Sequence, residues 1–176
     1  LFSTNILTHF FHKKYIFNTF NLVMSFVPEI RLLKGFCALN FGQNSEDAEA
    51  VFGIPEETQS LIDDILDTSS FVLHYWSKGF SLFFDVNNNK SLHIIEVDNA
   101  GTLLFGKLVF SLTEPQLVEL LKANGFKLSD AEKHEWGEKR LSFDEAGLDC
   151  YFENGKLTTI SFSLVQSAEN FRYFPN

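Results

Sequence analysis

The stretch Asp85–Glu96, DVNNNKSLHIIE, carries oxygen-bearing side chains at spacings close to those of a calcium-binding EF-hand loop. Asp85, Asn87 and Asn89 stand at the first, third and fifth positions. Glu96 stands at the twelfth, where such a loop supplies a bidentate carboxylate. Lys90, however, replaces the glycine that makes the sharp turn, and SLFF and HIIEV alternate in polarity as strands do. We therefore predict that the stretch is a hairpin between two strands and that it holds no metal ion.

Other residue types that could do chemistry are scattered along the chain. The five histidines show no metal-ligand spacing. His93 falls in phase with the core positions of its predicted strand, which predicts a hydrogen-bonded, half-buried histidine rather than a catalytic base. Cys37 and Cys150 form neither a disulfide framework nor a paired-cysteine metal motif. There is no nucleophile turn around a Ser or Cys, and no glycine-rich phosphate loop. We therefore predict that the protein is not an enzyme, has no catalytic residues and needs no cofactor.

Composition narrows the class of partner. The chain has 176 residues, of which 45% are hydrophobic and 21 are phenylalanine, so it can bury a sizeable core. A net charge of -9 argues against nucleic acid and against an anionic membrane surface, since both attract basic proteins. No apolar run reaches the roughly 18 to 20 residues that a membrane-spanning helix needs. We predict a cytoplasmic protein whose partner is another protein, one with a basic surface.

The first 23 residues differ from the rest. Residues 1–23 contain no Asp, Glu, Gly, Ala or Pro, and the only methionine, Met24, follows them. A secretory signal is one interpretation, but Lys13 and Lys14 interrupt the segment and no small-residue cleavage site follows. The composition resembles translated AT-rich upstream DNA, so we predict that residues 1–23 are a non-native or disordered leader.

The remainder of the chain resembles itself. YWSKGFSLFFD, residues 75–85, aligns with FDEAGLDCYFE, residues 143–153, and LHIIEV aligns with LTTISF further on. Upstream, Asn44 with Asp47 matches Thr113 with Gln116, each pair having the spacing of a helix-capping box. These matches predict a first unit over residues 24–98, a second over residues 99–164, and a C-terminal tail over residues 165–176.

Each unit is interpreted as a helix followed by an antiparallel meander. Helices are predicted at Glu46–Phe52, Glu57–Leu66 and Glu114–Ala123. Strands are predicted at 71–76, 79–85, 92–97, 139–144, 147–153 and 157–164. The predicted fold class is α+β, with two tandem repeats in one compact domain and the helices packed on one face of the sheet.

Two families share features with this pattern. FGQNSEDAEAVFGIP, followed by HYW and GFSLFFD, resembles the motif of the SmpA/OmlA outer-membrane assembly lipoproteins. A tandem pair of such units, over residues 39 to 164, resembles the beta-lactamase inhibitor proteins. The resemblance implies a helix-and-sheet fold that binds other proteins through its open sheet face. It carries no functional residue over to this chain.

Strand alternation predicts which side chains line that open face. In the first unit they include His74, Trp76, Phe83 and Ile94, an unusual amount of apolar surface to leave in water. In the second unit Tyr151 is the only aromatic residue on that face. We therefore predict a non-enzymatic protein-binding module, such as an immunity or inhibitor protein, that acts through this surface.

Three alternatives remain at this point. The leader or the aromatic tail, VQSAENFRYFPN, could cover the patch instead of a partner. A homodimer that joins two patches would also bury it. The alternative from another class is a small-molecule-binding protein or an unrecognised enzyme with a pocket between the sheet and the helices.

Overall fold

The computed structural model describes residues 26–63, 68–134 and 137–164, and its main element is an eight-stranded sheet. The order across this sheet is β10-β11-β12-β13-β7-β6-β5-β4, and every neighbouring pair is antiparallel. Its strands are β4 (Glu57–Asp63), β5 (Thr68–Tyr75), β6 (Phe80–Asp85), β7 (Ser91–Val97), β10 (Asp130–Lys133), β11 (Glu138–Phe143), β12 (Leu148–Glu153) and β13 (Lys156–Ser163). The hairpin predicted at Asp85 is confirmed, because β6 ends there and pairs with β7.

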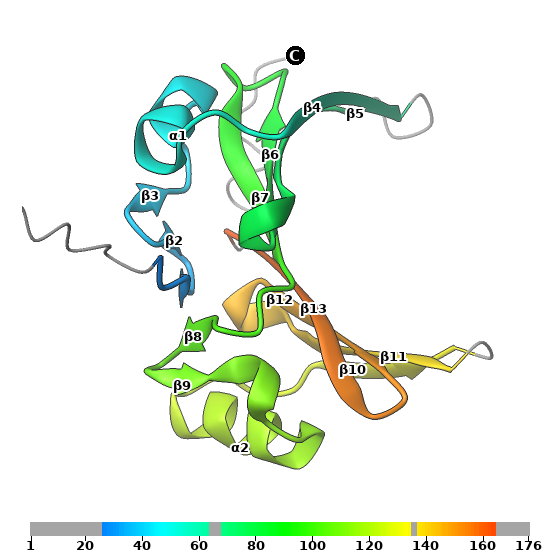
Figure 1. Ribbon diagram of the computed structural model, residues 1–176. Coiled ribbons are helices and arrows are strands. Elements are labelled where there is room, and N and C mark those ends of the chain that lie inside the picture. Colours follow the sequence, from blue (N-terminus) through cyan, green and yellow to red (C-terminus); the bar gives the residue numbers. More distant parts are fainter. Residues whose placement is uncertain (1–25, 64–67, 135–136, 165–176) are drawn as a thin grey trace, which may run out of the picture.

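A second layer covers one face of this sheet. It contains a five-stranded sheet in the order β3-β2-β1-β8-β9, in which β1 and β8 are parallel. The strands are short: β1 (Glu29–Arg31), β2 (Gly35–Phe36), β3 (Leu39–Asn40), β8 (Leu103–Leu104) and β9 (Lys107–Leu108). The helices α1 (Ser45–Phe52) and α2 (Glu114–Ala123) lie beyond the two ends of this small sheet (Figure 1). Three 3-10 turns complete the elements: η1 (Trp76–Lys78), η2 (Val109–Ser111) and η3 (Asp144–Ala146).

Both helices begin where their capping residues predict. The Asn44 side chain accepts a hydrogen bond from the Asp47 N–H, and the Asp47 carboxylate accepts one from the Asn44 N–H. Thr113 and Gln116 make the corresponding capping box at α2. These short-range exchanges satisfy backbone donors that have no partner within the helix, which fixes both starts locally.

The predicted fold class is wrong. The described residues form thirteen strands and two α-helices in two sheets, rather than two helix-and-meander repeats with helices on one face of a single sheet. The helix predicted at Glu57–Leu66 is not present, because Glu57–Asp63 forms β4 and pairs along its length with β5. Most of the strands in the small sheet have two residues, which is too short for any alternation of polarity to be recognised.

The core lies between the two layers, and phenylalanine rings dominate its centre. Phe36 of the small sheet is fully buried, and its ring centroid lies 5.0 Å from that of Phe80 and 6.4 Å from that of Phe162. Phe52 of α1 lies 6.0 Å from Phe36 and 4.8 Å from Phe80. Cys150 is also fully buried there, so it acts as a small apolar side chain. This cluster joins the covering layer to both halves of the large sheet.

Candidate functional site

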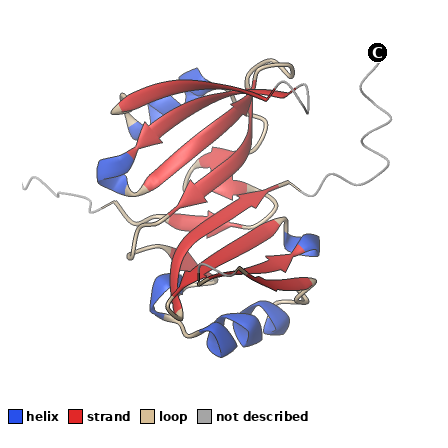
Figure 2. Cartoon of the chain, turned by 90° about the vertical axis from the view of Figure 1, so that its right-hand side faces the viewer, coloured by secondary structure: helices blue, strands red, loops and turns tan. Residues whose placement is uncertain are grey.

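The candidate site is the open face, defined as the side of the eight-stranded sheet that is opposite the core. Along β5, β6 and β7, Leu73, Leu82 and Ile95 point into the core, so their sequence neighbours point to the open face. Figure 2 looks onto this face. In Figure 1 the β4–β5 and β10–β11 hairpins both extend away from the covering layer, which makes the face concave.

A row of polar side chains crosses this face from one edge to the other. Each of the eight strands contributes one residue to the row, and each residue is paired with the one on the neighbouring strand. The row consists of Glu57, His74, Ser81, Glu96, Ser161, Asp149, Ser142 and Asp130. The sequence reasoning missed this row, because pairing between β7 and β13 joins segments far apart in the chain.

Glu96 lies near the middle of the row, between Ser81 and Ser161. Burial raises the pKa of the Glu96 carboxyl above its ordinary value of 4.5, whereas the nearby His74 favours the charged form and lowers it. His74 in turn shares a hydrogen bond between its Nδ1 and the Ser81 hydroxyl, at 2.9 Å. The protein therefore holds a half-buried carboxyl that accepts a proton more readily than a free one.

Replacing Glu96 by glutamine should stabilise the protein at neutral pH. A carboxyl whose pKa is higher in the folded state binds protons more tightly there, so stability falls as pH rises from 4.5 through the folded-state value. Glu96→Gln removes this loss, so its melting temperature should exceed that of the wild type at pH 7 and match it below pH 4.5. Glu153→Gln, at an exposed position of the same face, is the control for the general effect of removing one carboxylate. A wild-type advantage at pH 7 would contradict the expectation.

The five residues predicted for the open face all come from strands or turns that border it. His74 lies in the polar row, and Trp76 begins η1 with its ring stacked on His74 at 5.1 Å. Phe83 and Ile94 are partners in the neighbouring row. Tyr151 stands opposite Arg140. Trp76 is 58% exposed, whereas the other four are half-buried, so the apolar area open to water is smaller than predicted.

His93 is half-buried and hydrogen-bonded, as predicted, but its side chain is not in phase with the core. The register between β6 and β7 shifts at Phe83 and Phe84, and the resulting bulge takes His93 out of the alternation. The His93 Nε2 lies 3.4 Å from the hydroxyl of Ser70. Ser70 pairs with Asp85, and both side chains point to the open face, so His93 is on the open-face side too. Burial lowers the pKa of the His93 ring.

The open face is strongly acidic. Among the residues whose side chains the structure describes, strand register places eight carboxylates on this face, which are Glu57, Asp85, Glu96, Asp130, Glu132, Glu138, Asp149 and Glu153. The permanent cations at strand positions on this face are Arg140 and Lys156. The net charge of the chain alone does not show where its acidic residues gather.

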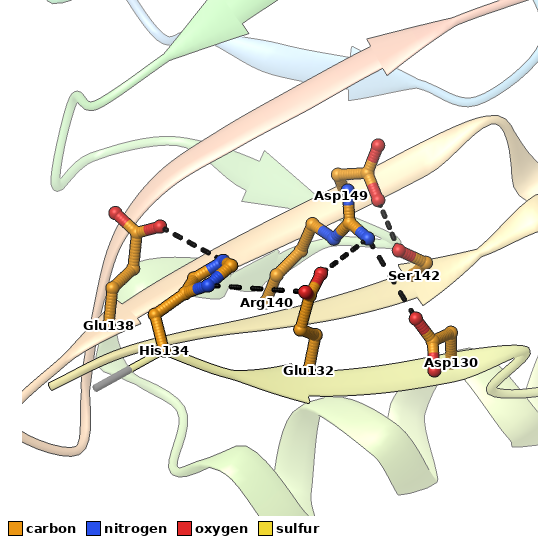
Figure 3. Close-up of polar contacts among 7 residues, drawn as sticks. All are labelled: Asp130, Glu132, His134, Glu138, Arg140, Ser142 and Asp149. Atoms are coloured by element: carbon orange, nitrogen blue, oxygen red, sulfur yellow. Dashed lines mark hydrogen bonds and ion pairs between the residues drawn. The ribbon is translucent and has the colours of Figure 1, made fainter. Parts of the chain in front are cut away.

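A cluster of these groups lies on β10, β11 and β12 (Figure 3). The Arg140 guanidinium donates to Glu132 at 2.9 Å and lies 3.8 Å from the Asp130 carboxylate. The Ser142 hydroxyl donates to Asp149. The carboxylates of Glu132 and Asp130 already neutralise the positive charge of Arg140. The remaining carboxylates keep the face acidic.

Metal and pocket sites have little support in the described ranges. Within these ranges, no group of three or more His, Cys, Asp or Glu side chains is placed to hold a metal ion. One small pocket lies between the turns at the ends of β11 and β12, lined by Gly137, Glu138, Glu153 and Asn154. It is not between the large sheet and the helices, where the small-molecule alternative predicts a site. No helix in the part of the chain described is long and apolar enough to cross a membrane.

Comparisons with known proteins assign no family. No protein-family model matches the sequence, and comparison with curated proteins also gave no match. A solved structure of a DUF4309 family protein from Bacillus subtilis is similar at 14% identity with a TM-score of 0.38. That similarity covers 69% of this chain and 78% of the other. The resemblance to the beta-lactamase inhibitor and SmpA/OmlA families stays a prediction.

Proposed function

We propose that this chain is a non-enzymatic binding module that holds a basic protein partner on its open face. The observation that carries the proposal is the eight-to-two excess of carboxylates over permanent cations on this concave surface. Such a surface attracts a partner of opposite charge and repels acidic competitors, which favours fast and selective association. An inhibitor or immunity protein that covers a basic site on its target would work in this way.

The edge of the open face also offers a suitable anchor. Trp76 is 58% exposed, and its ring stacks on His74, which shares a hydrogen bond with Ser81. A tryptophan held in place by its neighbours loses little conformational freedom when a partner covers it. Tryptophan is also enriched among the few residues that contribute most of the binding free energy at interfaces. We therefore expect Trp76 to lie inside the contact area.

Trp76→Ala should leave the protein folded and weaken partner binding by about 2 kcal/mol or more, which is roughly a 30-fold loss of affinity. Partners captured from lysate by the immobilised protein can be identified by mass spectrometry and then purified for direct titration. The matched control is Ile54→Ala, which removes another exposed apolar side chain, 86% exposed and outside the large sheet.

The salt dependence separates the proposal from a purely apolar contact, and a second variant tests the middle of the face. Affinity for the purified partner should fall as sodium chloride is raised, because salt screens exposed charges. Phe83→Asp removes apolar contact area from the middle of the face and should also abolish capture, while circular dichroism still shows a folded chain. Equal losses in Trp76→Ala and Ile54→Ala, or unfolding of both Trp76→Ala and Phe83→Asp, would refute the proposed surface.

A further inference from the structure

The outer edge of β4 is open to another strand. β4 is the last strand of the eight-stranded sheet, and no strand in the described ranges pairs with its outer side. An edge strand presents a row of backbone N–H and C=O groups without strand partners, which can pair with an added chain. The occupant of this edge must therefore supply an extended backbone.

The hydrogen bonds of β5 show which groups of β4 turn outward. The Ser69 carbonyl accepts a hydrogen bond from Val86 at 3.0 Å, so Ser69 directs its backbone groups towards β6. Successive residues of a strand alternate in direction, so Ser70 directs its groups to its β4 partner, Leu61. It follows that Ser60 and Ile62, on either side of Leu61, turn their N–H and C=O groups away from the sheet.

The side chains of β4 do not protect this edge. From Thr58 to Ile62 the sequence is TQSLI, which contains no charge and no proline, and Leu61 and Ile62 are 40% and 73% exposed. The opposite edge of the same sheet, β10, has the sequence DAEK, in which three of four residues are charged. Charged side chains are a common device against strand pairing at an edge. The two edges of the sheet thus differ in the charge of their side chains, which is the property that discourages strand addition at β10 and not at the centre of β4.

We propose that β4 is a strand-addition site for an extended segment of a partner protein, with an uncharged centre and a basic residue at the end that lies beside Glu57. Glu57 lies at one end of the uncharged centre of β4 and is exposed, so a Lys or Arg at the end of the added strand beside it would lie near a carboxylate. Lys at both ends of a test peptide places one Lys at this end of β4 whichever direction the peptide runs. A second copy of the chain fits less well, since its own β4 sequence, ETQSLID, contains no Lys or Arg. The inference goes beyond the proposed function because it does not require the open face.

The probes are peptides of 7 residues, the length of β4. One set has centres that vary among Thr, Val and Ile and carries Lys at both ends, and a second set is identical except for Glu at both ends. Hydrogen exchange measured by NMR on the full chain reports each backbone amide separately. Lys-ended peptides should slow exchange at Ser60 and Ile62, and Glu-ended peptides should bind at least about tenfold more weakly.

Ser60→Pro tests the contact without breaking the sheet, because it removes an N–H that does not bond to β5. It should reduce peptide affinity by at least about tenfold and leave the folded spectrum unchanged. The matched control is Ala131→Pro on β10. The His134 N–H donates to the Glu138 carbonyl, so His134 directs its backbone groups towards β11. By alternation along β10, Ala131 directs its groups away from the sheet, as Ser60 does on β4. Ala131→Pro should therefore leave peptide affinity unchanged.

Three outcomes would overturn the inference. The first is that no Lys-ended peptide slows exchange at Ser60 and Ile62. The second is that Ser60→Pro and Ala131→Pro reduce affinity equally, since binding would then not depend on β4. The third is that, without peptide, hydrogen exchange at these two amides slows as the protein concentration rises. The strand added to β4 would then come from a second copy of the chain.

Discussion

Replacing Phe36 by alanine should lower the free energy of unfolding by about 3–5 kcal/mol. The Phe36 side chain is fully buried, and its ring lies against those of Phe52, Phe80 and Phe162. Truncation removes its buried apolar area and leaves a cavity that rings held by two different layers cannot easily close. Urea denaturation followed by tryptophan fluorescence would measure the change as a lower midpoint with an unchanged slope.

A comparison variant is available in the same covering layer. Phe105 is 38% exposed and stacks on Phe126 at 6.3 Å, so Phe105→Ala should cost about 1 kcal/mol or less. If Phe36→Ala does not fold at all, Phe36→Leu retains most of the volume and should give a smaller but measurable loss. A change below about 1 kcal/mol in Phe36→Ala would mean that the two layers are not joined through this ring.

Features that depend on neighbours in the sequence could be predicted. The helices near residues 46–52 and 114–123 were predicted within one residue of their observed bounds, because their capping boxes involve contacts three positions apart. The β6–β7 hairpin was predicted for the same reason, since alternating strands on both sides of a polar turn form a local pattern.

Features that depend on distant pairing could not be predicted. Leu61 and Ile62 belong to a pattern that fits an amphipathic helix, yet pairing with β5 makes Glu57–Asp63 a strand. The parallel pair of β1 and β8 joins residues about seventy positions apart, and no local signal marks either strand. Tertiary contacts determined both features: they overrode a local helix preference in β4, and they formed the β1–β8 pair where the sequence shows no local preference.

The candidate site shows the same division. Alternation alone indicated that Phe83, Ile94 and Tyr151 share a face with His74. It did not reveal that Glu96 and Asp149 lie in one row with His74, because that row exists only when β13 pairs with β7 and β12. The bulge at His93 was also invisible, since one extra residue in a strand leaves no mark on its composition. The acidic character of the open face is therefore a property of the fold.

Gly147→Ala should be among the most damaging single substitutions, with a loss of about 3 kcal/mol or more. Gly147 follows η3 with a φ of +57°, a conformation that side chains with a Cβ adopt at a cost. It also receives a hydrogen bond at its carbonyl from the Ser163 N–H at 2.8 Å. A Cβ at this position would lie 2.4 Å from the Ser163 carbonyl oxygen, a backbone atom that cannot move without disturbing β13.

Gly155→Ala separates the two causes, because Gly155 also has a positive φ, +78°, but a Cβ there meets nothing within 4 Å. This control should cost only about 1 kcal/mol, which is the conformational cost without the clash. Denaturation midpoints of the two variants measure the difference, and Gly147→Ala should also speed hydrogen exchange at Ser163. Equal losses in the two variants would show that β13 can shift to accommodate the added Cβ. The close approach of Gly147 to Ser163 would then make no contribution to stability, and only the backbone conformation of Gly147 would matter.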